Sequence, residues 1–437
     1  MGGISGIFLN ILNAIYSFVG NYGWSVVLFT LVIRFVLLPL DIKQRKSMRA
    51  MTRIQPKQME LQRKYGKDKE KYNQKLQELY KKEHIKPLAG CLPMLIQLPL
   101  LWFMFDSMRF LASEQMASML LGVVDSLPAL ADGTTVRAAL ASIQIDLSGL
   151  NITSEQISLI LENLSLSAEQ IQALNGLGAI SLSFDQITSL SAQLSAEQAQ
   201  LISAQLQAFF NGFTLTAEQA SGVAANIPFQ SWLWIKNVFE PDSFMNTILP
   251  AAKSLTTSNS DILSSMQLRV QSGSAVLNQT NLEIVANFLK TPAYASIASA
   301  LGANDFMRIP LNLIFVQPTL TLPVSFSALF NSTNGLFILP LFAAASQFFM
   351  TKLTQPKQPD TPVPADQQQV NPMNSGVMKW FFPLFSLWIC AGYNAAFAIY
   401  WGAVNVIQIV QTVLINLYFE RKDKLAALAQ GEGEGKN

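Results

Sequence analysis

The 437-residue chain has few of the residues on which most catalytic and metal sites depend. It contains two cysteines and one histidine, His84, and only 13% of its residues are charged. A metal site or a Cys/His catalytic pair needs more of these side chains than the chain supplies. Cys91 and Cys390 lie at different depths of the topology derived below, so no disulfide is predicted. We therefore expect a protein with no catalytic residues, no metal and no cofactor.

What the chain has instead is long apolar runs. Half of its residues are apolar, and they form continuous runs rather than amphipathic stripes. A helix needs about 20 apolar residues to cross the hydrocarbon core of a bilayer. Segments that reach or approach this length predict an all-α polytopic membrane protein with five transmembrane helices, at 23–40, 88–111, 336–353, 376–392 and 393–419.

The charges are distributed unevenly between these spans. Residues 41–86 contain fifteen Lys or Arg against six Asp or Glu, whereas 112–335 contain six against fifteen. Short basic loops stay in the cytoplasm. We therefore place the N-terminus outside and the C-terminus inside, with 112–335 extracytoplasmic and with a cytoplasmic loop at 354–375 and a cytoplasmic tail at 420–437. The N-terminus resembles neither a signal peptide nor a transit peptide, which favours the plasma (inner) membrane of a prokaryote.

Two segments beside the first span have a helical periodicity of their own. Apolar residues recur every three or four positions within 1–22, which predicts an amphipathic helix at the outer membrane interface. Residues 41–87 predict a helical hairpin whose turn contains Gly66, a residue that can adopt a left-handed conformation. Pro56 is expected to bend the first arm or to start its second half.

The extracytoplasmic region 112–335 contains a degenerate repeat in which Gln follows a Ser or Thr by three positions. The copies begin at Thr153, Ser167, Ser183, Ser195 and Thr216. A Ser or Thr N-cap with Gln at the third helical position is a capping box. The repeat therefore predicts a stack of short capped helices, so that the insertion is mostly helical. The repeat is only a weak indication of function.

One charge lies where a membrane helix rarely carries one. Arg34 is roughly 15 Å below the outer end of the first span, near the middle of the bilayer. A guanidinium there costs about 2.5–3.5 kcal/mol on insertion scales unless water or a partner reaches it. No span has an Asp or Glu at its centre, which predicts a hydrated cavity around Arg34 rather than a buried ion pair. Snorkelling of the side chain to the cytoplasmic surface is the alternative.

Further polar residues lie within two other spans. Gln97 is central in the second span, and Asn405, Gln408 and Gln411 recur every three residues along the fifth. Hydrogen bonds between helices could explain this polar stripe alone. A wet groove would explain the stripe, Gln97 and Arg34 together, and we adopt that interpretation.

Several segments together resemble the YidC/Oxa1/Alb3 family of membrane insertases. The motifs are Leu31–Leu40 around Arg34, Gln55-Pro56 to Tyr65, Gly90–Pro99, Trp232–Ile235 with Pro241-Asp242, Met378–Pro383, Tyr400-Trp401 with Asn405, and Gln411. The resemblance covers 1–111, 228–250 and 336–424. Relative to that family, 113–227 and about 255–335 are insertions.

The resemblance implies five core helices around a hydrophilic groove. It implies that Arg34 attracts the hydrophilic or acidic outer segment of a nascent membrane protein, that Gln97 and Gln411 hydrate this segment, and that the apolar helix leaves into the lipid bilayer. The hairpin would recruit nascent chains, with the ribosome, signal-recognition machinery or Sec translocon as partners and no direct readout of nucleic acid. The expected recruitment residues are Gln55, Pro56, Tyr65, Gly66 and Tyr72.

Other classes of function fit less well. A small-solute or anion transporter or channel could use Arg34 as its binding site, but the five spans show no inverted repeat. A membrane enzyme would need a catalytic constellation, which the extracytoplasmic region lacks. An adhesive or scaffold role of that region could coexist with membrane insertion.

Overall fold

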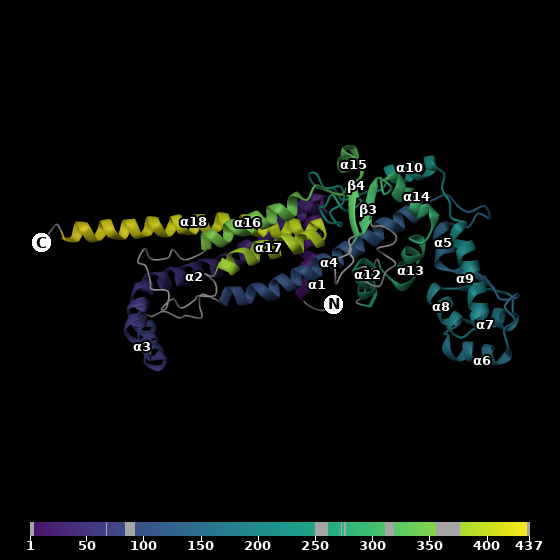
Figure 1. Ribbon diagram of the computed structural model, residues 1–437, viewed down its shortest axis with the longest axis horizontal. Coiled ribbons are helices and arrows are strands. Elements are labelled where there is room, and N and C mark those ends of the chain that lie inside the picture. The colour runs from purple at the N-terminus through teal and green to yellow at the C-terminus, as the bar shows by residue number, and fades with distance from the viewer. Residues whose placement is uncertain are drawn as a thin grey trace. The chain divides into compact units, whose positions relative to one another are not determined.

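The computed structural model describes residues 4–66, 68–83, 92–249, 261–271, 273–274, 277–310, 319–354 and 376–434. These residues are mostly helical (Figure 1). The chain divides into two compact units. We call residues 2–108 with 337–437 the central unit, and 109–336 the insert unit.

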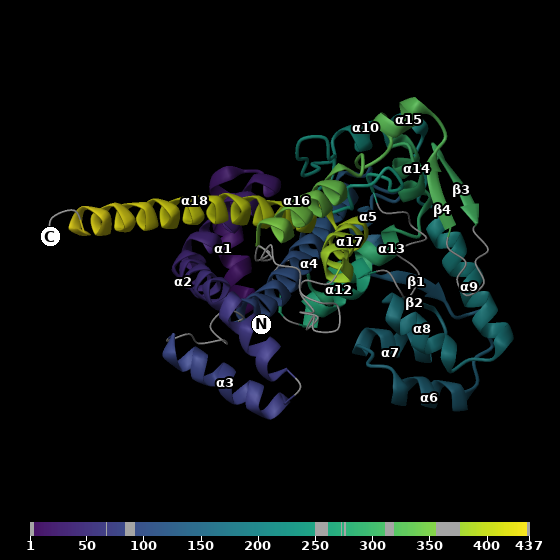
Figure 2. The same ribbon diagram turned by 60° about the vertical axis from the view of Figure 1, so that its left-hand side comes forward.

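The central unit consists of helices. They are α1 (Ile4–Val19), α2 (Tyr22–Tyr65), α3 (Lys69–Lys82), the first half of α4 (Leu92–Ser126), α16 (Ile338–Thr354), α17 (Gly376–Gly392) and α18 (Ala395–Glu434). Helix α16 packs against α17 and α18, and α18 also packs against α2. Figure 2 shows α16 lying beside α18.

Within the described residues, two segments are long and apolar enough to cross a membrane: Tyr22–Ile54 and Ala395–Leu425. Gly6–Val19, Ile338–Leu353 and Trp380–Gly392 are shorter apolar helices. The five-span assignment therefore remains a prediction. His84, Cys91, the side chains of Gln55 and Gln97, and almost all of the loop 354–375 lie outside the described residues.

Helix α2 is longer than either predicted segment that it contains. It runs for 44 residues and joins the predicted first span to the first arm of the hairpin without a break. Asn21 caps its N-terminus by accepting a hydrogen bond from the backbone N–H of Trp24 at 3.2 Å. Pro39 and Pro56 both lie inside the helix, so Pro56 does not start a new one.

The turn after α2 differs from the prediction. Gly66 has φ −61° and ψ −23°, a right-handed conformation, so the predicted use of a left-handed glycine is wrong. The glycine is needed for close approach instead, because a Cβ atom there would lie 2.5 Å from the backbone oxygen of Gln62. The same oxygen accepts the Gly66 N–H at 2.8 Å. The tight turn thus depends on the missing side chain.

Helix α3 then packs against the end of α2 and forms the second arm of a helical hairpin. The amide of Gln58 donates to the hydroxyl of Tyr80 at 3.2 Å. Lys57 forms an ion pair with Glu83 at 2.6 Å. These polar contacts hold the two arms together in a hairpin that has few apolar side chains.

The insert unit combines short helices with two antiparallel strand pairs, so this region is mostly helical rather than all-α. Strand β1 (Ile143–Asp146) pairs with β2 (Ala179–Leu182), and β3 (Phe306–Pro310) with β4 (Thr319–Pro323). Its helices are the second half of α4, α5 (Val136–Ala141), α6 (Ser154–Asn163), α7 (Ala168–Asn175), α8 (Phe184–Ala192), α9 (Ala196–Asn211), α10 (Ala217–Ala225), α12 (Asp261–Gln271), α13 (Gln279–Phe288), α14 (Pro292–Ala300) and α15 (Phe326–Asn331).

The five predicted capping boxes are confirmed, at the N-termini of α6 to α10. In each, the Ser or Thr side chain accepts the N–H of the Gln and the Gln side chain accepts the N–H of the cap. Helix α9 has 16 residues and is longer than the predicted short helices. The glutamines also pair between helices: the Gln156 amide donates to Gln198 at 2.8 Å, and that of Gln170 to Gln186 at 3.2 Å.

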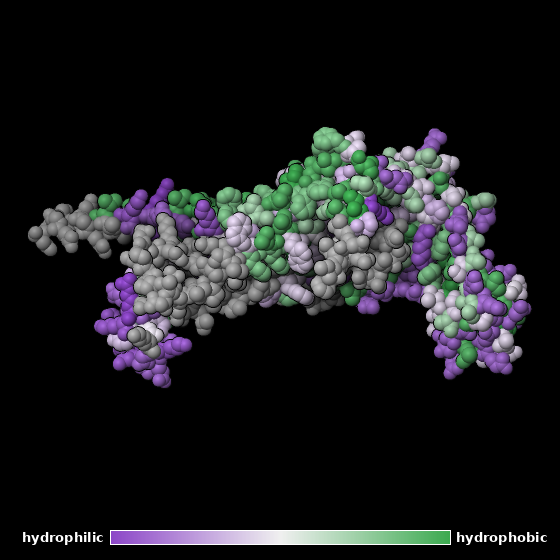
Figure 3. Space-filling model, viewed as in Figure 1, coloured by the Kyte–Doolittle hydropathy of each residue, from purple (hydrophilic) through white to green (hydrophobic). Residues whose placement is uncertain are grey.

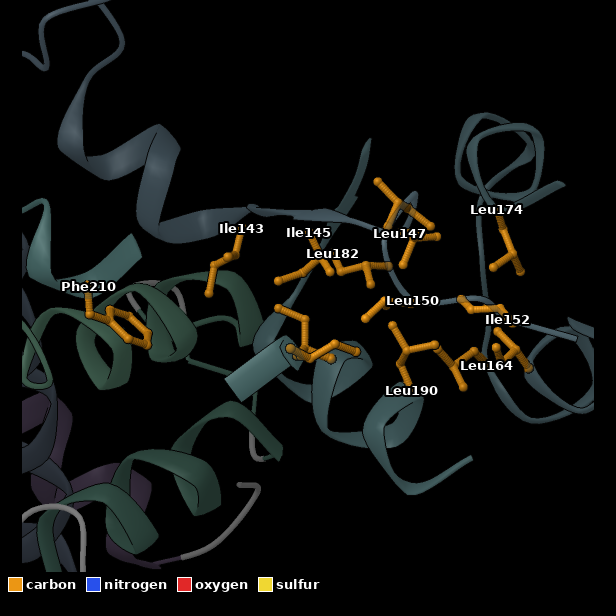
Figure 4. Packing of buried hydrophobic residues seen from close by; sticks show 14 residues of the cluster. Ile143, Ile145, Leu147, Leu150, Ile152, Leu164, Leu174, Leu182, Leu190 and Phe210 are labelled. Atoms are coloured by element: carbon orange, nitrogen blue, oxygen red, sulfur yellow. The ribbon is translucent and has the colours of Figure 1, made fainter. Parts of the chain in front are cut away.

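Residues 143–212 form a small domain with two similar halves, β1-α6-α7 and β2-α8-α9. Ile143 and Ile145 of one strand face the same core as Leu182 of the other (Figure 4), and Ile180 belongs to that core as well. Buried and exposed positions alternate along both strands, the pattern of a half-buried strand. The antiparallel strands and the two Gln–Gln pairs relate the halves by an approximate twofold arrangement.

Candidate functional site

Arg34 lies on α2 and is only 4% exposed. Its partner is on α18. With the amide oxygen of Gln408 turned toward the guanidinium, Gln408 accepts hydrogen bonds from both terminal nitrogens of Arg34, at 2.7 and 2.9 Å. This orientation is the one that satisfies the amide, because the opposite one sets its N–H groups against other donors. The buried charge is therefore held by a neutral side chain.

Gln411 completes this contact one turn further along α18. Its amide N–H donates to the backbone oxygen of Arg34 at 3.4 Å. Its own oxygen, Oε1, is buried and has no hydrogen-bond partner among the described residues. Buried polar atoms are usually paired, so Gln411 presents an acceptor that a donor entering this site could use.

Two further charges follow Arg34 on the same face of α2. Asp41 and Arg45 lie seven and eleven residues after it, and these intervals return to nearly the same side of a helix. The Asp41 carboxylate interacts electrostatically with both arginines. Arg45 donates a hydrogen bond to the buried Thr412 of α18. The site is thus a row of charges along the interface of α2 and α18.

Sequence analysis missed Asp41 and Arg45 as members of this site. The predicted end of the first span at residue 40 assigned both to the hairpin, away from Arg34. The sequence analysis considered only acids at the centres of the spans, and Asp41, just beyond the predicted end of the first span, acts on Arg34 through its charge. The available signal was the spacing of seven and four residues, which would have been recognised if α2 had been taken as one continuous helix.

Asn405 belongs to a different interface. Its amide donates to Ser346 Oγ at 3.0 Å and to the backbone oxygen of Ala343 at 3.4 Å, both on α16. Asn405 is buried. The predicted polar stripe therefore splits: Gln408 and Gln411 meet Arg34, whereas Asn405 joins α18 to α16. Interhelical hydrogen bonding is sufficient to explain Asn405.

Close packing accompanies that second interface. Gly402 lies one turn before Asn405, and a Cβ atom there would lie 3.1 Å from two ring carbons of Phe342 on α16. Small residues let membrane helices approach closely, so that a hydrogen bond such as that of Asn405 can form. Helix α16 is thus held firmly against α18.

Many outward-facing side chains of the apolar helices of the central unit are hydrophobic. Exposed ones include Phe35 and Val36 on α2, Leu341 and Phe349 on α16, Leu384 and Trp388 on α17, and Val410 and Leu414 on α18. Figure 3 shows hydrophobic atoms over α16. Soluble monomers rarely expose so much contiguous apolar surface. A lipid environment accounts for both the apolar exterior and the polar contacts inside.

Of the predicted recruitment residues, Tyr65 and Gly66 lie at the hairpin turn, Tyr72 lies in α3, and Gln55 and Pro56 lie in α2 about ten residues before the turn. Pro56 is exposed. The Lys71 ammonium lies over the Tyr65 ring, 5.9 Å from its centroid. Tyr72 is half-buried, and burial raises the pKa of its hydroxyl. No residue of α3 is buried, so a partner that binds this arm of the hairpin would meet a charged, solvated surface.

Apolar helices that enclose a buried arginine and glutamines define a polytopic α-helical membrane protein with a polar site between its helices. The model of the 60Kd inner membrane protein family matches residues 14–171 and 276–422, and the chain belongs to this family. The resemblance recognised from the motifs is thereby confirmed. The match omits 172–275 but includes 113–171 and 276–335, which the motifs alone assign to insertions.

The chain is similar to several proteins named membrane protein insertase YidC. It is 43% identical to that of Fusobacterium nucleatum over 99 residues, 23% of this chain and 48% of the relative. It is 44% identical to that of Caldanaerobacter subterraneus over 110 residues, 25% of this chain and 53% of the relative. For a protein of Legionella pneumophila the identity is 43% over 110 residues, 24% of this chain and 20% of the relative. The matches thus span about half the length of these relatives or less. No solved structure matches the chain.

Proposed function

We propose that this chain is a membrane-protein insertase, in which α2, α4, α16, α17 and α18 span an inner membrane around a hydrophilic groove. In this proposal the N-terminus is outside, the hairpin is cytoplasmic, and the insert unit is extracytoplasmic. Membership in the family and the name of its relatives support the class of function. The observation that carries the mechanism is the buried Arg34, held by the neutral Gln408.

A neutral partner matters because it satisfies N–H groups without cancelling charge. An arginine paired with a carboxylate would attract a second carboxylate weakly. Arg34 bonded to Gln408 keeps its positive charge, and an acidic side chain arriving at about 4 Å would gain roughly 4 kcal/mol of Coulomb energy at an effective dielectric constant of 20. The substrate carboxylate would displace Gln408 without first breaking a resident ion pair, and Gln408 would bond to Arg34 again when the substrate leaves.

The rest of the proposed insertion path of the substrate involves Gln411 at the α2–α18 interface and the outer faces of α16 and α18. Gln411 Oε1 offers an acceptor to water or to the polar segment of the substrate. The apolar helix of the substrate would move into lipid along the exposed apolar faces of α16 and α18. The chain lowers a transfer barrier and makes or breaks no covalent bond. Nascent chains delivered by the ribosome, signal-recognition machinery or a Sec translocon are the proposed clients of the basic hairpin.

The test is insertion of a single-span substrate with an acidic outer segment into proteoliposomes that contain the full chain. We expect Arg34→Ala to reduce insertion about tenfold, equivalent to about 1.4 kcal/mol, and Arg34→Lys to retain part of the activity. Arg53→Ala is the matched control, since it removes the same charge from an exposed position of α2. The proposal is wrong if both Arg34 variants insert the substrate as well as the starting protein. Anion flux that depends on Arg34 would indicate a channel instead.

A further inference from the structure

The insert unit carries an apolar surface at α15, just before the chain enters α16. Phe326 is 78% exposed and Phe330 49% exposed. They lie four residues apart on one side of the helix, with ring centroids 5.0 Å apart. Val324, two residues before the helix, is also exposed, and Figure 3 shows hydrophobic atoms over α15. We call Val324, Phe326 and Phe330 the aromatic foot.

Hydrogen bonds at both ends of α15 fix the helix that carries the aromatic foot. The Lys236 ammonium donates to the last two backbone oxygens of α15, at Phe330 (2.8 Å) and Asn331 (2.6 Å). At the start of the helix, the Ala328 N–H donates to the Ser325 side chain at 3.1 Å. Both ends of α15 are thus capped, so its two phenylalanines are held outward rather than folding back onto the unit.

The segment that follows α15 is fixed as well. The Asn334 amide donates to the backbone oxygens of Asn237 and Pro241, both at 2.9 Å, and its oxygen accepts the Asn237 N–H at 2.8 Å. Asp242 accepts the Leu336 N–H at 2.9 Å. A Cβ atom on Gly335 would lie 2.0 Å from an Asp242 oxygen, so Gly335 permits this contact. The segment that leads from α15 toward α16 is therefore fixed by hydrogen bonds to residues 237–242.

The length of this path limits how far the foot can be from the membrane. From Asn331 to the first residue of α16, Ile338, is seven residues, at most roughly 25 Å when fully extended. If α16 crosses the membrane, its outer end lies at the bilayer surface, and the foot is within that distance of it. Phenylalanine is among the side chains that helices at a membrane interface bury at the boundary between headgroups and acyl chains.

Charge also favours a lipid surface as the occupant. Residues 112–335 are acidic overall, yet two of their six basic residues lie on segments next to α15. The acid nearest to them, Asp305, accepts the Val324 N–H through its backbone oxygen at 2.8 Å, and its carboxylate accepts the Ser332 hydroxyl. Lys236 caps α15. Arg308 is exposed on β3, which pairs with the strand that contacts α15. Basic side chains around exposed aromatics match anionic lipid headgroups below an apolar layer.

We propose that the aromatic foot binds the outer leaflet of the membrane and holds the insert unit against the lipid surface. This inference requires that α16 spans the membrane, as in the proposed function. It adds an interfacial lipid-binding site in a part of the chain that the groove does not use.

The test places spin labels on single cysteines of the full chain, after Cys91→Ser and Cys390→Ala, in liposomes of phosphatidylethanolamine and phosphatidylglycerol. Labels at Phe326→Cys and Phe330→Cys report on the foot. Leu159→Cys and Leu201→Cys are matched controls, because both leucines are exposed apolar residues of the same unit. Leu341→Cys, on the exposed face of α16, tests the span itself. The measurement is the accessibility of each label to oxygen, which concentrates in lipid, and to a water-soluble nickel chelate.

We expect the oxygen-to-nickel ratio to be several-fold higher at both foot positions than at both controls. A nickel accessibility at the foot equal to that of the controls would overturn the proposal. Protection from both reagents, unchanged when liposomes are replaced by detergent micelles, would also overturn it and indicate contact with a second copy or another protein. A nickel-accessible label at Leu341 would instead show that the assumed span, and with it the proposed topology, is wrong.

Discussion

Replacing Gln408 by methionine tests whether the buried arginine depends on a neutral amide. Methionine has nearly the same volume but accepts no comparable hydrogen bond. Each bond to a charged group contributes about 1.5–3 kcal/mol, and Gln408 accepts two from Arg34. The guanidinium would remain buried without them. We expect Gln408→Met to lower the free energy of unfolding by about 3 kcal/mol, with part of the loss offset by water entering the site.

A double-mutant cycle separates this interaction from general packing. In an Arg34→Met background the charge is absent, so Gln408→Met should cost little, and the coupling energy should be about 2–3 kcal/mol. Asn405→Leu is the control on the same helix. Its amide bonds to α16, so it should destabilise the protein without coupling to Arg34. Equilibrium unfolding in mixed micelles measures all of these free energies.

Gln408→Glu distinguishes stability from function. The carboxylate would form a permanent ion pair with Arg34, so this variant should insert an acidic substrate more slowly than the starting protein even if it is more stable. Coupling below about 0.5 kcal/mol, the error of additivity, would refute the Arg34–Gln408 contact. Full insertion activity of Gln408→Glu would refute the argument that the partner must be neutral.

Three further predictions concern other parts of the chain. Burial raises the pKa of Glu240 from 4.5 to about 8, so the folded insert unit keeps a proton that the unfolded chain releases. Thermal stability should therefore fall as pH rises from 4.5 to 8, and Glu240→Gln should remove this slope. Gly66→Ala brings a Cβ atom against the Gln62 oxygen, and should destabilise the hairpin turn by about 1–2 kcal/mol, seen as faster amide exchange there. Asp41→Asn removes the negative charge that acts on Arg34, and should increase insertion of acidic substrates relative to neutral ones in the proteoliposome assay.

The local features of the insert unit were predictable because they depend on residues close together in sequence. A capping box needs only a Ser or Thr and a Gln three positions later, and all five form. The strands β1 and β2 were not predicted. Each has only four residues, and their pairing joins segments separated by two helices. Their alternation of Ile with polar or small residues was the available signal.

Arg34 was identified from sequence because a charge among apolar residues is conspicuous, but its surroundings were not. Its neighbours come from α18, and a one-dimensional pattern does not specify which helices meet. Asp41 was excluded by a span boundary drawn where the apolar run ends. The helix continues through that boundary, because backbone hydrogen bonding does not stop where hydropathy changes.

The division of the polar stripe follows from helix geometry. At 3.6 residues per turn, a step of three residues rotates the side chain by roughly 60° around the axis. Asn405 and Gln411 therefore point about 120° apart, far enough to face different neighbours, while Gln408 lies between them. Steps of seven and eleven residues depart by only about 20° from a full number of turns, which keeps Arg34 and the charges after it on one face of α2. A period of three thus predicts a helix that contacts two partners, and intervals of seven and eleven predict a row along a single interface.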